Sequence, residues 1–478
     1  MRKLLLAPLA ALVLVTACKQ NDDPTPSNPG GLNPNDSTDY KAATVARTSN
    51  PTAFNEPATT ELADTISSNT VLKSGNTYML MNFVYVTNGA TLKIEPGVII
   101  KGDKANKGSL IITRNGMIDA QGTASSPIVF TSAQASPARG DWGGIIILGN
   151  ARTNGEFSGT AGLQEVEGGV NNSIGYGLHG GTVDADNSGT LKYVRIEYGG
   201  IAFQPNSEIN GLTMGSVGSG TTIDYVEVYN SGDDGFEWFG GSVNAKHLIS
   251  VGATDDDFDS DNGFSGKVQY GISLRDNQQA DFAAGGTSNG FESDNNANGT
   301  TALPQTSAVF ANFTMVGPKA TAGTPAAPYG RGAHIRRNSA ISLLNVSMIG
   351  WKTGVRIDGQ RTNDVFAGGT AELRNLIVAG ADAGKQIDTA GGITANGINP
   401  AAFFATTGWG NVSLTNSADV MLSTIILGTG FNPSPVAGSP LLAATVLTSA
   451  KTSGLETANY SGAVGGGNST WWQGWTKF

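Results

Sequence analysis

A strand-like unit recurs through the middle of this chain, and its spacing restricts the fold more than any other feature. Each copy alternates apolar and polar residues around a central Tyr, His or Asn, and this period of two is typical of β-strands. Three central residues, Tyr225, His247 and Tyr270, are separated by steps of 22 and 23 residues. The copies are Leu191–Ile196, Ile223–Val228, Ala245–Ser250, Val268–Ser273, Ala311–Met315, Leu344–Met348 and Arg374–Val378.

Repeats of roughly 20 to 50 residues that each offer one strand indicate a solenoid, in which every coil packs only on its neighbours. A β-propeller also has many short strands, but each blade needs about four strands in roughly 40 residues. The steps of 22 and 23 residues leave room only for single coils. The sequence therefore predicts an all-β parallel β-helix over residues 46–440, followed by a C-terminal capping segment over residues 441–478.

The composition agrees with this architecture and restricts the partners. The chain has 66 glycines and only 14% charged residues, which favours tight turns between short strands over a helical fold. Its formal net charge of −10 argues against nucleic acid as a direct partner. A negative protein suits calcium, or a ligand that is held through its hydroxyl groups.

The N-terminus has the parts of a bacterial lipoprotein signal: a positively charged start, an apolar stretch and a small-residue cleavage site that ends at Cys18. Cys18 is the single cysteine of the chain, so no intrachain disulfide is possible. We expect residues 1–17 to be a signal peptide, Cys18 to carry lipid, and the polar residues 18–45 to be a flexible tether. The lipid would anchor the protein to the outer membrane.

Several motifs resemble secreted right-handed parallel β-helix proteins of the Bacteroidota. They are Leu92–Gly102, Gly140–Ile145, Phe431–Pro433, Gly438–Leu442 and Trp472–Thr476. The run Lys19–Asp23 also resembles the surface-export signal of lipoproteins from these bacteria, which implies a location on the cell surface. The broader similarity is to the pectin-lyase-like superfamily, whose members include lyases, hydrolases and non-catalytic adhesins. The resemblance therefore implies a fold and leaves the function open.

Acidic residues gather in a second strand of the repeat. Because alternate residues of a strand share a face, one set should point inward and the other outward. The expected inward ladder is Phe236, Phe258, Phe291, Ile335 and Val355. The expected outward column is Glu237, Asp259, Glu292, Arg336 and Arg356, acidic on the earlier coils and basic on the later ones. A slip of one residue would reverse the faces.

Ionised carboxylates one coil apart repel each other unless a cation lies between them. Calcium takes roughly six to eight oxygen ligands, which Asp and Glu side chains supply. The sequence therefore predicts bound Ca²⁺, with candidate ligands Asp233, Asp234, Glu237, Asp255, Asp256, Asp257, Asp259, Asp261, Glu292 and Asp294. The alternative interpretation is that these acids form turns and carry solvated charge.

Four arginines are candidate catalytic or ligand-binding residues: Arg275, Arg336, Arg337 and Arg356. Calcium-dependent β-helix lyases use a Lys or Arg as base, but a neutral Arg is rare because its pKa lies above about 12. Glycoside hydrolases use paired carboxylates instead. We expect a non-catalytic scaffold that binds a glycan or a partner protein. The alternatives are a calcium-dependent polysaccharide lyase or glycoside hydrolase, and an accessory subunit of an outer-membrane transporter.

The remaining polar and aromatic candidates have simpler interpretations. His179, His247 and His334 are scattered along the chain, so structural roles are expected for them. The C-terminal tryptophans Trp471, Trp472 and Trp475 could stack on sugar rings. Aromatic residues that close the open end of a solenoid are commoner, and we expect that role here.

Overall fold

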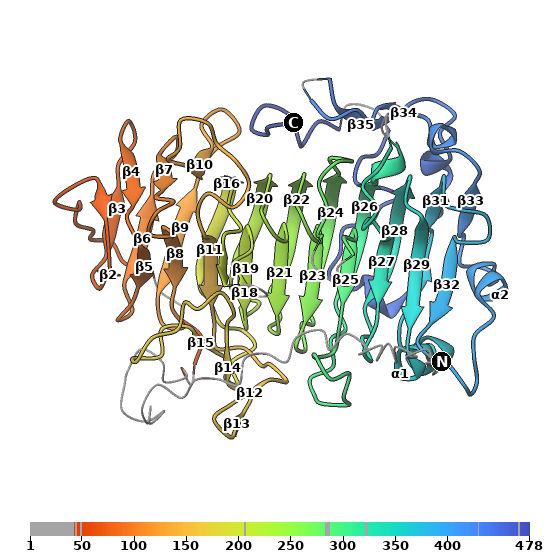
Figure 1. The fold of residues 1–478 in the computed structure, drawn as a ribbon, viewed down its shortest axis with the longest axis horizontal. Helices are drawn as coiled ribbons and strands as arrows, with labels where there is room; N and C mark the ends of the chain where they lie inside the picture. Colours follow the sequence, from red (N-terminus) through yellow and green to blue (C-terminus); the bar gives the residue numbers. More distant parts are fainter. Residues whose placement is uncertain are drawn as a thin grey trace, which may run out of the picture.

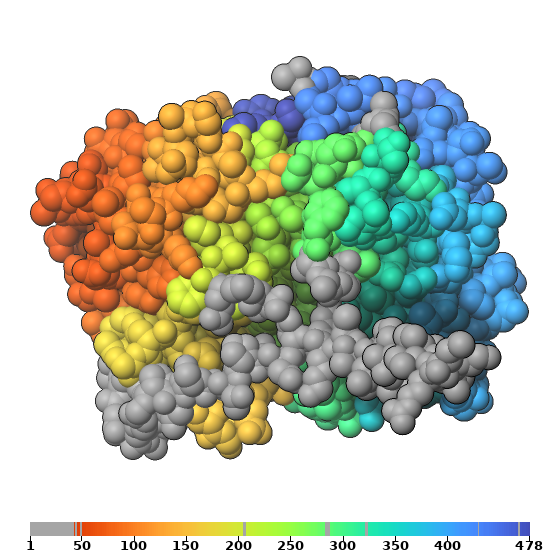
Figure 2. Space-filling model, in the orientation of Figure 1, coloured from red at the N-terminus to blue at the C-terminus, as the bar shows by residue number. Residues whose placement is uncertain are grey.

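A computed structural model describes residues 43, 45–47, 50–204, 207–282, 287–320, 324–428, 430–466 and 469–478. Coils of chain stack along the long axis in sequence order, as the colours of Figures 1 and 2 show. The predicted signal peptide, Cys18 and most of the tether lie outside the described residues. None of the helices in these ranges has the length and apolar character of a membrane span.

The first of two large sheets contains 16 strands within the described residues, and its strands pair in parallel. Its main row is β1 Glu61–Leu62, β4 Thr77–Leu80, β7 Ile99–Gly102, β10 Ile128–Ser132, β16 Gly189–Glu197, β20 Thr222–Tyr229, β22 Ala245–Val251, β24 Lys267–Leu274, β26 Val309–Val316, β28 Ser342–Ile349, β31 Ile377–Ala379 and β33 Val412–Leu414. Four further strands pair with this row or with each other: β3 Thr70–Leu72, β6 Thr91–Ile94, β9 Met117–Gln121 and β30 Leu373–Arg374.

The second sheet contains 11 strands of the described chain, again paired in parallel. They are β2 Thr65–Ile66, β5 Phe83–Val86, β8 Ser109–Ile112, β11 Gly144–Leu148, β19 Leu212–Gly215, β21 Phe236–Phe239, β23 Phe258–Asp261, β25 Phe291–Ser293, β27 Arg331–Ile335, β29 Thr353–Asp358 and β32 Ile387–Ala390. Successive coils contribute one strand to each sheet, so the predicted right-handed parallel β-helix is confirmed.

The remaining elements lie in loops that leave the coils. In the described part of the chain, four antiparallel hairpins pair β12 Glu156–Phe157 with β13 Thr160–Ala161, β14 Gln164–Glu165 with β15 Leu178–His179, β17 Ala202–Gln204 with β18 Ser207–Glu208, and β34 Leu422–Thr424 with β35 Asn432–Pro435. The helices are α1 Gln360–Ala367, α2 Pro400–Phe404 and the 3₁₀ turns Pro318–Ala320, Ser417–Val420, Pro440–Ala443 and Ala450–Thr452. The hairpins of β12 to β15 project from one side of the solenoid (Figure 1).

The central Tyr, His or Asn of the repeat forms a corner in the long strands of the first sheet. Tyr225 and His247 have φ angles of 55° and 53°, in the left-handed region, and the equivalent residues of the neighbouring coils share it. The Tyr225 ring stacks on the rings of Tyr193 and His247 at centroid distances of 4.4 and 4.2 Å. On later coils asparagines replace the rings, and Asn375 donates a hydrogen bond of 2.8 Å to Asn345. The structural role expected for His247 agrees with this stack.

The interior of the coils is a continuous apolar core. The rings of Phe236, Phe258 and Phe291 are fully buried and follow one another up the second sheet, as predicted. The Phe236 and Phe258 rings stack at 5.4 Å with an interplanar angle of 10°. Each alternate residue of these strands therefore faces outward, where the candidate site lies.

The C-terminal segment does not close the end of the solenoid, which corrects the expectation for residues 441–478. It runs back along the outer face of the first sheet, and its end lies beside the earlier coils (Figure 1). Trp472 and Trp475 are buried in an apolar cluster with outward residues of that sheet, such as Ile249 and Ile272. The outward positions of this sheet are apolar, so covering them with the tryptophans removes a large hydrophobic surface from water.

The same segment ends on two buried carboxylates. The backbone N–H of Lys477 donates to both carboxylate oxygens of Glu227 at 2.9 Å. Its ammonium group donates to Glu197 at 3.1 Å. Burial raises the pKa of Glu227 to about 8, although Lys477 and Arg195 counteract the shift.

Replacing Glu227 with Gln should therefore remove a pH dependence of stability. The folded protein keeps a proton on Glu227 up to about pH 8, whereas the unfolded chain loses it near the ordinary pKa of 4.5. Stability should fall as the pH rises through this window in the native protein, and fall less in Glu227→Gln. Melting temperatures of both proteins across the window measure the difference, with the exposed change Glu61→Gln as control. Parallel curves for native protein and Glu227→Gln would contradict the expectation.

Candidate functional site

The outward positions of the second sheet form one column in exact strand register along the solenoid. From the N-terminal coil onward it reads Thr65, Tyr85, Ile111, Ile146, Thr213, Glu237, Asp259, Glu292, His334, Arg356 and Asp388. The column is uncharged on the early coils, acidic from Glu237 to Glu292, and continues through His334 and Arg356 to the acid Asp388. The predicted outward face is therefore confirmed, whereas the predicted change from acidic to basic holds only at Arg356.

One coil of that prediction was wrong by two residues. His334, not Arg336, lies beside Glu292, and Ala333, not Ile335, lies beside Phe291. Both pairs keep the same faces because a shift of two residues preserves the alternation of a strand. Arg336 still reaches the acidic column, since its guanidinium contacts Glu292 and also donates to Asp294 at 2.8 Å.

The middle of the column opens into a cavity of about 1000 Å³. Its floor is formed by β21, β23 and β25, and its walls by residues 154–171, the β17–β18 hairpin and residues 296–302. Among the described lining residues, thirteen carry carboxyl groups and only two, Arg336 and Arg337, carry guanidinium groups. The thirteen are Glu156, Glu165, Glu167, Glu208, Asp233, Asp234, Glu237, Asp255, Asp256, Asp259, Asp261, Glu292 and Asp294.

Two of the aspartates have a structural role in the turn before each strand. The Asp234 carboxylate accepts the backbone N–H of Asp256 at 2.7 Å, and Asp256 accepts that of Asn289. Asn210 and Asn289 continue the ladder, because they accept the N–H groups of Asp234 and Arg331, each at 3.2 Å. One side-chain oxygen in each coil thus binds the next coil, which agrees with the turn-forming interpretation for these positions.

Asp257 and Arg275 lie outside the cavity, in the interior between the two sheets. Both are fully buried, and Arg275 Nε donates to the Asp257 carboxylate at 3.0 Å. Ser250 donates to the other oxygen at 2.8 Å, and the guanidinium also donates to the Ala253 carbonyl at 2.8 Å. The sequence predicted Asp257 as a metal ligand and Arg275 as a catalytic or ligand-binding residue. The structure instead places both side chains where a bound ligand has no access.

Arg356 also lies outside the cavity lining. It forms two hydrogen bonds with Asp388, of 2.9 and 2.7 Å. Arg336 and Arg337 do line the cavity and both bind Asp294. The four arginines are therefore divided between the cavity wall, the interior and the later coils.

Three groups of carboxylates are close enough to share a cation. Their oxygens lie within 4.8 Å of one another in Asp233–Asp234–Asp255, in Asp234–Glu237–Asp259 and in Asp256–Asp259–Glu292. Asp259 belongs to two of the groups. One buried oxygen of Asp255 and one of Asp259 have no hydrogen-bond partner. A buried carboxylate oxygen without a partner is costly, and a cation would satisfy it.

The electrostatics of the cavity require compensation. Burial, followed by the charge of neighbouring carboxylates, raises the pKa of the following seven acids well above ordinary values: Asp233, Asp234, Glu237, Asp255, Asp256, Asp259 and Asp261. Burial acts in the same direction on Glu292, but Arg336 and His334 lower its pKa to about 2. Burial and mutual repulsion thus both disfavour the ionised forms of these seven acids, and a bound cation would offset that cost.

The donor set fits calcium. Calcium prefers carboxylate, amide and carbonyl oxygens in flexible geometry, and the described cavity lining offers clustered carboxyl groups together with the side-chain amides of Asn154, Asn171 and Asn262. The described cavity lining includes no histidine or cysteine, the ligands that zinc and copper prefer. Carboxylates alone also suit magnesium, but a cavity of about 1000 Å³ does not impose the compact octahedral geometry that magnesium demands.

Sequence reasoning missed the walls of the cavity. Glu165, Glu167 and Glu208 come from loops between coils and belong to no repeat, so no alignment of strands could assign them. The role of His334 was missed because of the misaligned coil; it lies 3.0 Å from Asp358 and 3.5 Å from Glu292. The signal for the correct alignment was Gly332, which precedes Ala333 as Gly235 precedes Phe236.

Known proteins agree with the fold. The model of a family described as the pectate-lyase like β-helix domain matches residues 64–424. The chain belongs to this family. No curated protein matches it. Among solved structures, the catalytic domain of a GH87 α-1,3-glucanase in complex with tetrasaccharides is similar over 78% of this chain and 71% of that chain, at 10% identity and a TM-score of 0.27. A TM-score this low says nothing of activity.

Proposed function

We propose that this β-helix protein is a non-catalytic binding scaffold that holds calcium in its acidic cavity and binds a carbohydrate there. The observation that carries the proposal is the pair of orphan oxygens on Asp255 and Asp259 within overlapping carboxylate groups. Calcium bound to several protein oxygens keeps open coordination positions, and sugar hydroxyl groups can fill them. With Cys18 lipidated, the scaffold would be displayed on the outer membrane of the cell.

Calcium should stabilise the protein, and Asp259→Asn should weaken that effect. Asp259 is shared by two carboxylate groups, so loss of its charge should lower calcium affinity roughly tenfold or more. The same change relieves repulsion between buried acids, so the variant without calcium should be more stable than the native protein. Saturating calcium at about a hundred times its Kd should add about 2.7 kcal/mol to the free energy of unfolding of the native protein.

Calorimetric titration of calcium into the chelator-treated protein, with unfolding curves at each concentration, measures both effects. The exposed change Glu61→Gln is the matched control, because it removes one carboxylate outside the cavity. Binding should release protons, because a cation favours the ionised form of carboxyl groups whose pKa values are raised. Absence of binding heat from a folded protein, or equal affinity in Asp259→Asn, would refute the proposal.

One observation favours glycoside hydrolysis as a second candidate function. Glycosidases need one protonated and one ionised carboxyl group, and the cavity places Asp259, whose pKa is raised, beside Glu292, whose pKa is lowered. Release of reducing ends from a panel of polysaccharides, lost in Glu292→Gln, would establish it. A lyase is less well supported: burial lowers the pKa of Arg336, but Glu292 and Asp294 outweigh it and raise the pKa well above its ordinary value, and a base must first lose its proton.

A further inference from the structure

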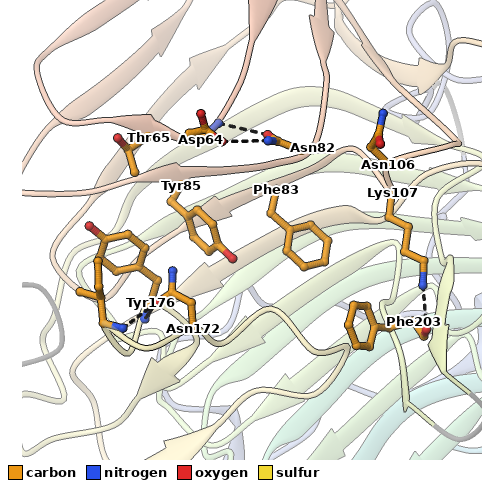
Figure 3. Close-up of a pocket in the computed structure, with 11 residues that line it drawn as sticks. Asp64, Thr65, Asn82, Phe83, Tyr85, Asn106, Lys107, Asn172, Tyr176 and Phe203 are labelled. Carbon is orange, nitrogen blue, oxygen red and sulfur yellow. Dashed lines mark hydrogen bonds between the residues drawn. The ribbon is translucent and has the colours of Figure 1, made fainter. Parts of the chain in front are cut away.

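A second cavity, of about 480 Å³, lies near the N-terminal end of the same outer face (Figure 3). Four aromatic rings border it: Phe83 and Tyr85 from β5, Tyr176 from the loop before β15, and Phe203 from β17. The volume falls within the roughly 300–1,000 Å³ typical of small-molecule sites. Nothing in the repeat pattern predicted this pocket, because seven of its eleven described lining residues lie in loops.

Two rings of the pocket, Tyr85 and Tyr176, are 9% and 7% exposed and pack in an apolar cluster outside the coils, whereas Phe83 and Phe203 remain more accessible. Val84 and Val86 of β5 are fully buried in the interior, so the alternating Phe83 and Tyr85 point outward. Phe203 is 38% exposed and Ile174 is 42% exposed. The Phe83 ring lies 6.1 Å from that of Phe203 and 6.4 Å from that of Tyr85. Clustered apolar side chains that remain accessible indicate a binding surface.

Polar groups hold the rings in place and edge the pocket. The Lys107 ammonium donates to the Phe203 carbonyl at 2.7 Å and lies 4.4 Å from the centre of its ring. Asn82 donates to Asp64 at 2.9 Å on the opposite side. Asn172 accepts three backbone N–H groups through its side-chain oxygen, and Figure 3 shows its amide nitrogen directed toward Tyr85. Amides, an ammonium group and a carboxylate thus surround aromatic surfaces.

We propose that this pocket binds one neutral pyranose ring of a polysaccharide. The C–H face of a sugar packs on aromatic rings, while its hydroxyl groups both donate and accept hydrogen bonds at the edge. Among the described lining residues, Lys107 carries the one ammonium group and Asp64 the one carboxylate, so these residues offer no net charge to a uronate. A pocket with aromatic surfaces and few charges favours a neutral sugar ring over a charged one.

The pocket and the acidic cavity share a wall. Phe203 lines both, and Asn172 of the pocket directly follows Asn171 of the cavity. A chain of sugars that enters the pocket can therefore continue over Phe203 toward the calcium ligands. This continuation rests on the proposed function, whereas the binding of a single ring in the pocket does not.

Saturation-transfer NMR of the purified protein with di- to hexasaccharides of glucose, mannose, galactose and xylose tests the pocket. Transfer to ring C–H protons is expected for at least one neutral series, both in calcium and in chelator. Phe203→Leu and Phe83→Leu should weaken binding roughly tenfold, and Phe203→Trp should preserve it. The control is Ile426→Ala, which removes an apolar group that is 67% exposed elsewhere.

Three outcomes would overturn the proposal: no transfer to any neutral sugar, equal binding by both leucine variants, or loss of disaccharide binding in chelator. The last outcome would place the ring on the cation instead of in the pocket. Failure of the calcium site alone gives a different result, because the disaccharide would still bind and calcium would add nothing to the affinity of the hexasaccharide. The two proposals can therefore fail separately.

Discussion

Replacing Arg275 with Met is expected to destabilise the protein by roughly 3–5 kcal/mol, because it leaves the Asp257 carboxylate buried without its cation. Both side chains are 0% exposed, and the guanidinium is also enclosed by Tyr329 and Trp351, whose ring centres lie 5.6 and 5.8 Å away. Methionine fills part of the volume but replaces none of the hydrogen bonds to Asp257 and Ala253. Urea unfolding followed by fluorescence measures the loss.

A double replacement separates the charge from the packing. Asp257→Asn together with Arg275→Met removes both charges, so it should recover a large part of the stability that Arg275→Met loses. If Arg275 instead served a ligand, as the sequence suggested, Arg275→Met would unfold at nearly the native urea concentration and would lose only binding. That result would contradict the buried ion pair.

Phe258→Ala is the second change expected to have a large effect, again a loss of roughly 3–5 kcal/mol. The Phe258 ring lies between those of Phe236 and Phe291, at 5.4 and 5.6 Å, and the Phe313 ring meets it edge-on at 5.1 Å. Truncation removes these contacts and leaves a cavity that a stacked β-helix has little freedom to fill. Thermal or urea unfolding would show the loss.

The matched control for Phe258→Ala is Phe282→Ala, the same change at a side chain that is 69% exposed. It should alter stability by no more than about 0.5 kcal/mol. Phe258→Leu should cost less than Phe258→Ala, because leucine fills more of the space. Equal effects at the buried and the exposed positions would show that the ladder of rings is not a source of stability.

The architecture could be predicted from the sequence because the repeat encodes it locally. The steps between Tyr225, His247 and Tyr270 set one coil each, and alternation around Phe258 and Asp259 fixed the faces of the strand. The misalignment at His334 arose because Ile335 and Ala333 both face inward. The isoleucine is the larger of the two, so it was aligned with Phe291 in place of the alanine. Gly332 resolves this ambiguity, because a Cβ there would lie 2.9 Å from the carbonyl of Gly354 on the next coil.

The candidate site was only half predictable. The floor acids, such as Glu237 and Asp259, follow the strand period and were found. The walls come from loops of unequal length, so Glu167, Glu208 and the whole aromatic pocket around Phe203 left no periodic signal. Asp257 differs from its neighbours for another reason: the turn directs its side chain inward to Arg275, and a run of three aspartates does not reveal which one turns inward.

The path of the C-terminal segment also could not be predicted. Its tryptophans are compatible both with closing the solenoid and with covering its side. The decisive residues are the outward apolar positions of the first sheet, such as Ile249 and Ile272, which Trp472 and Trp475 keep from water. In the sequence these residues are indistinguishable from the inward residues of an apolar strand. The sequence therefore did not indicate that the outer face of this sheet is covered by another segment.

The most direct test of the calcium site is a crystal structure of the protein soaked in terbium, a calcium substitute whose anomalous scattering marks each ion. We expect at least one peak in the acidic cavity, within coordination distance of Asp259 and of either Glu237 or Glu292, and none of comparable height in a crystal of Asp259→Asn. A cavity without a peak at saturating terbium, with Asp255 and Asp259 still lacking partners, would show that the acidic cavity does not bind calcium.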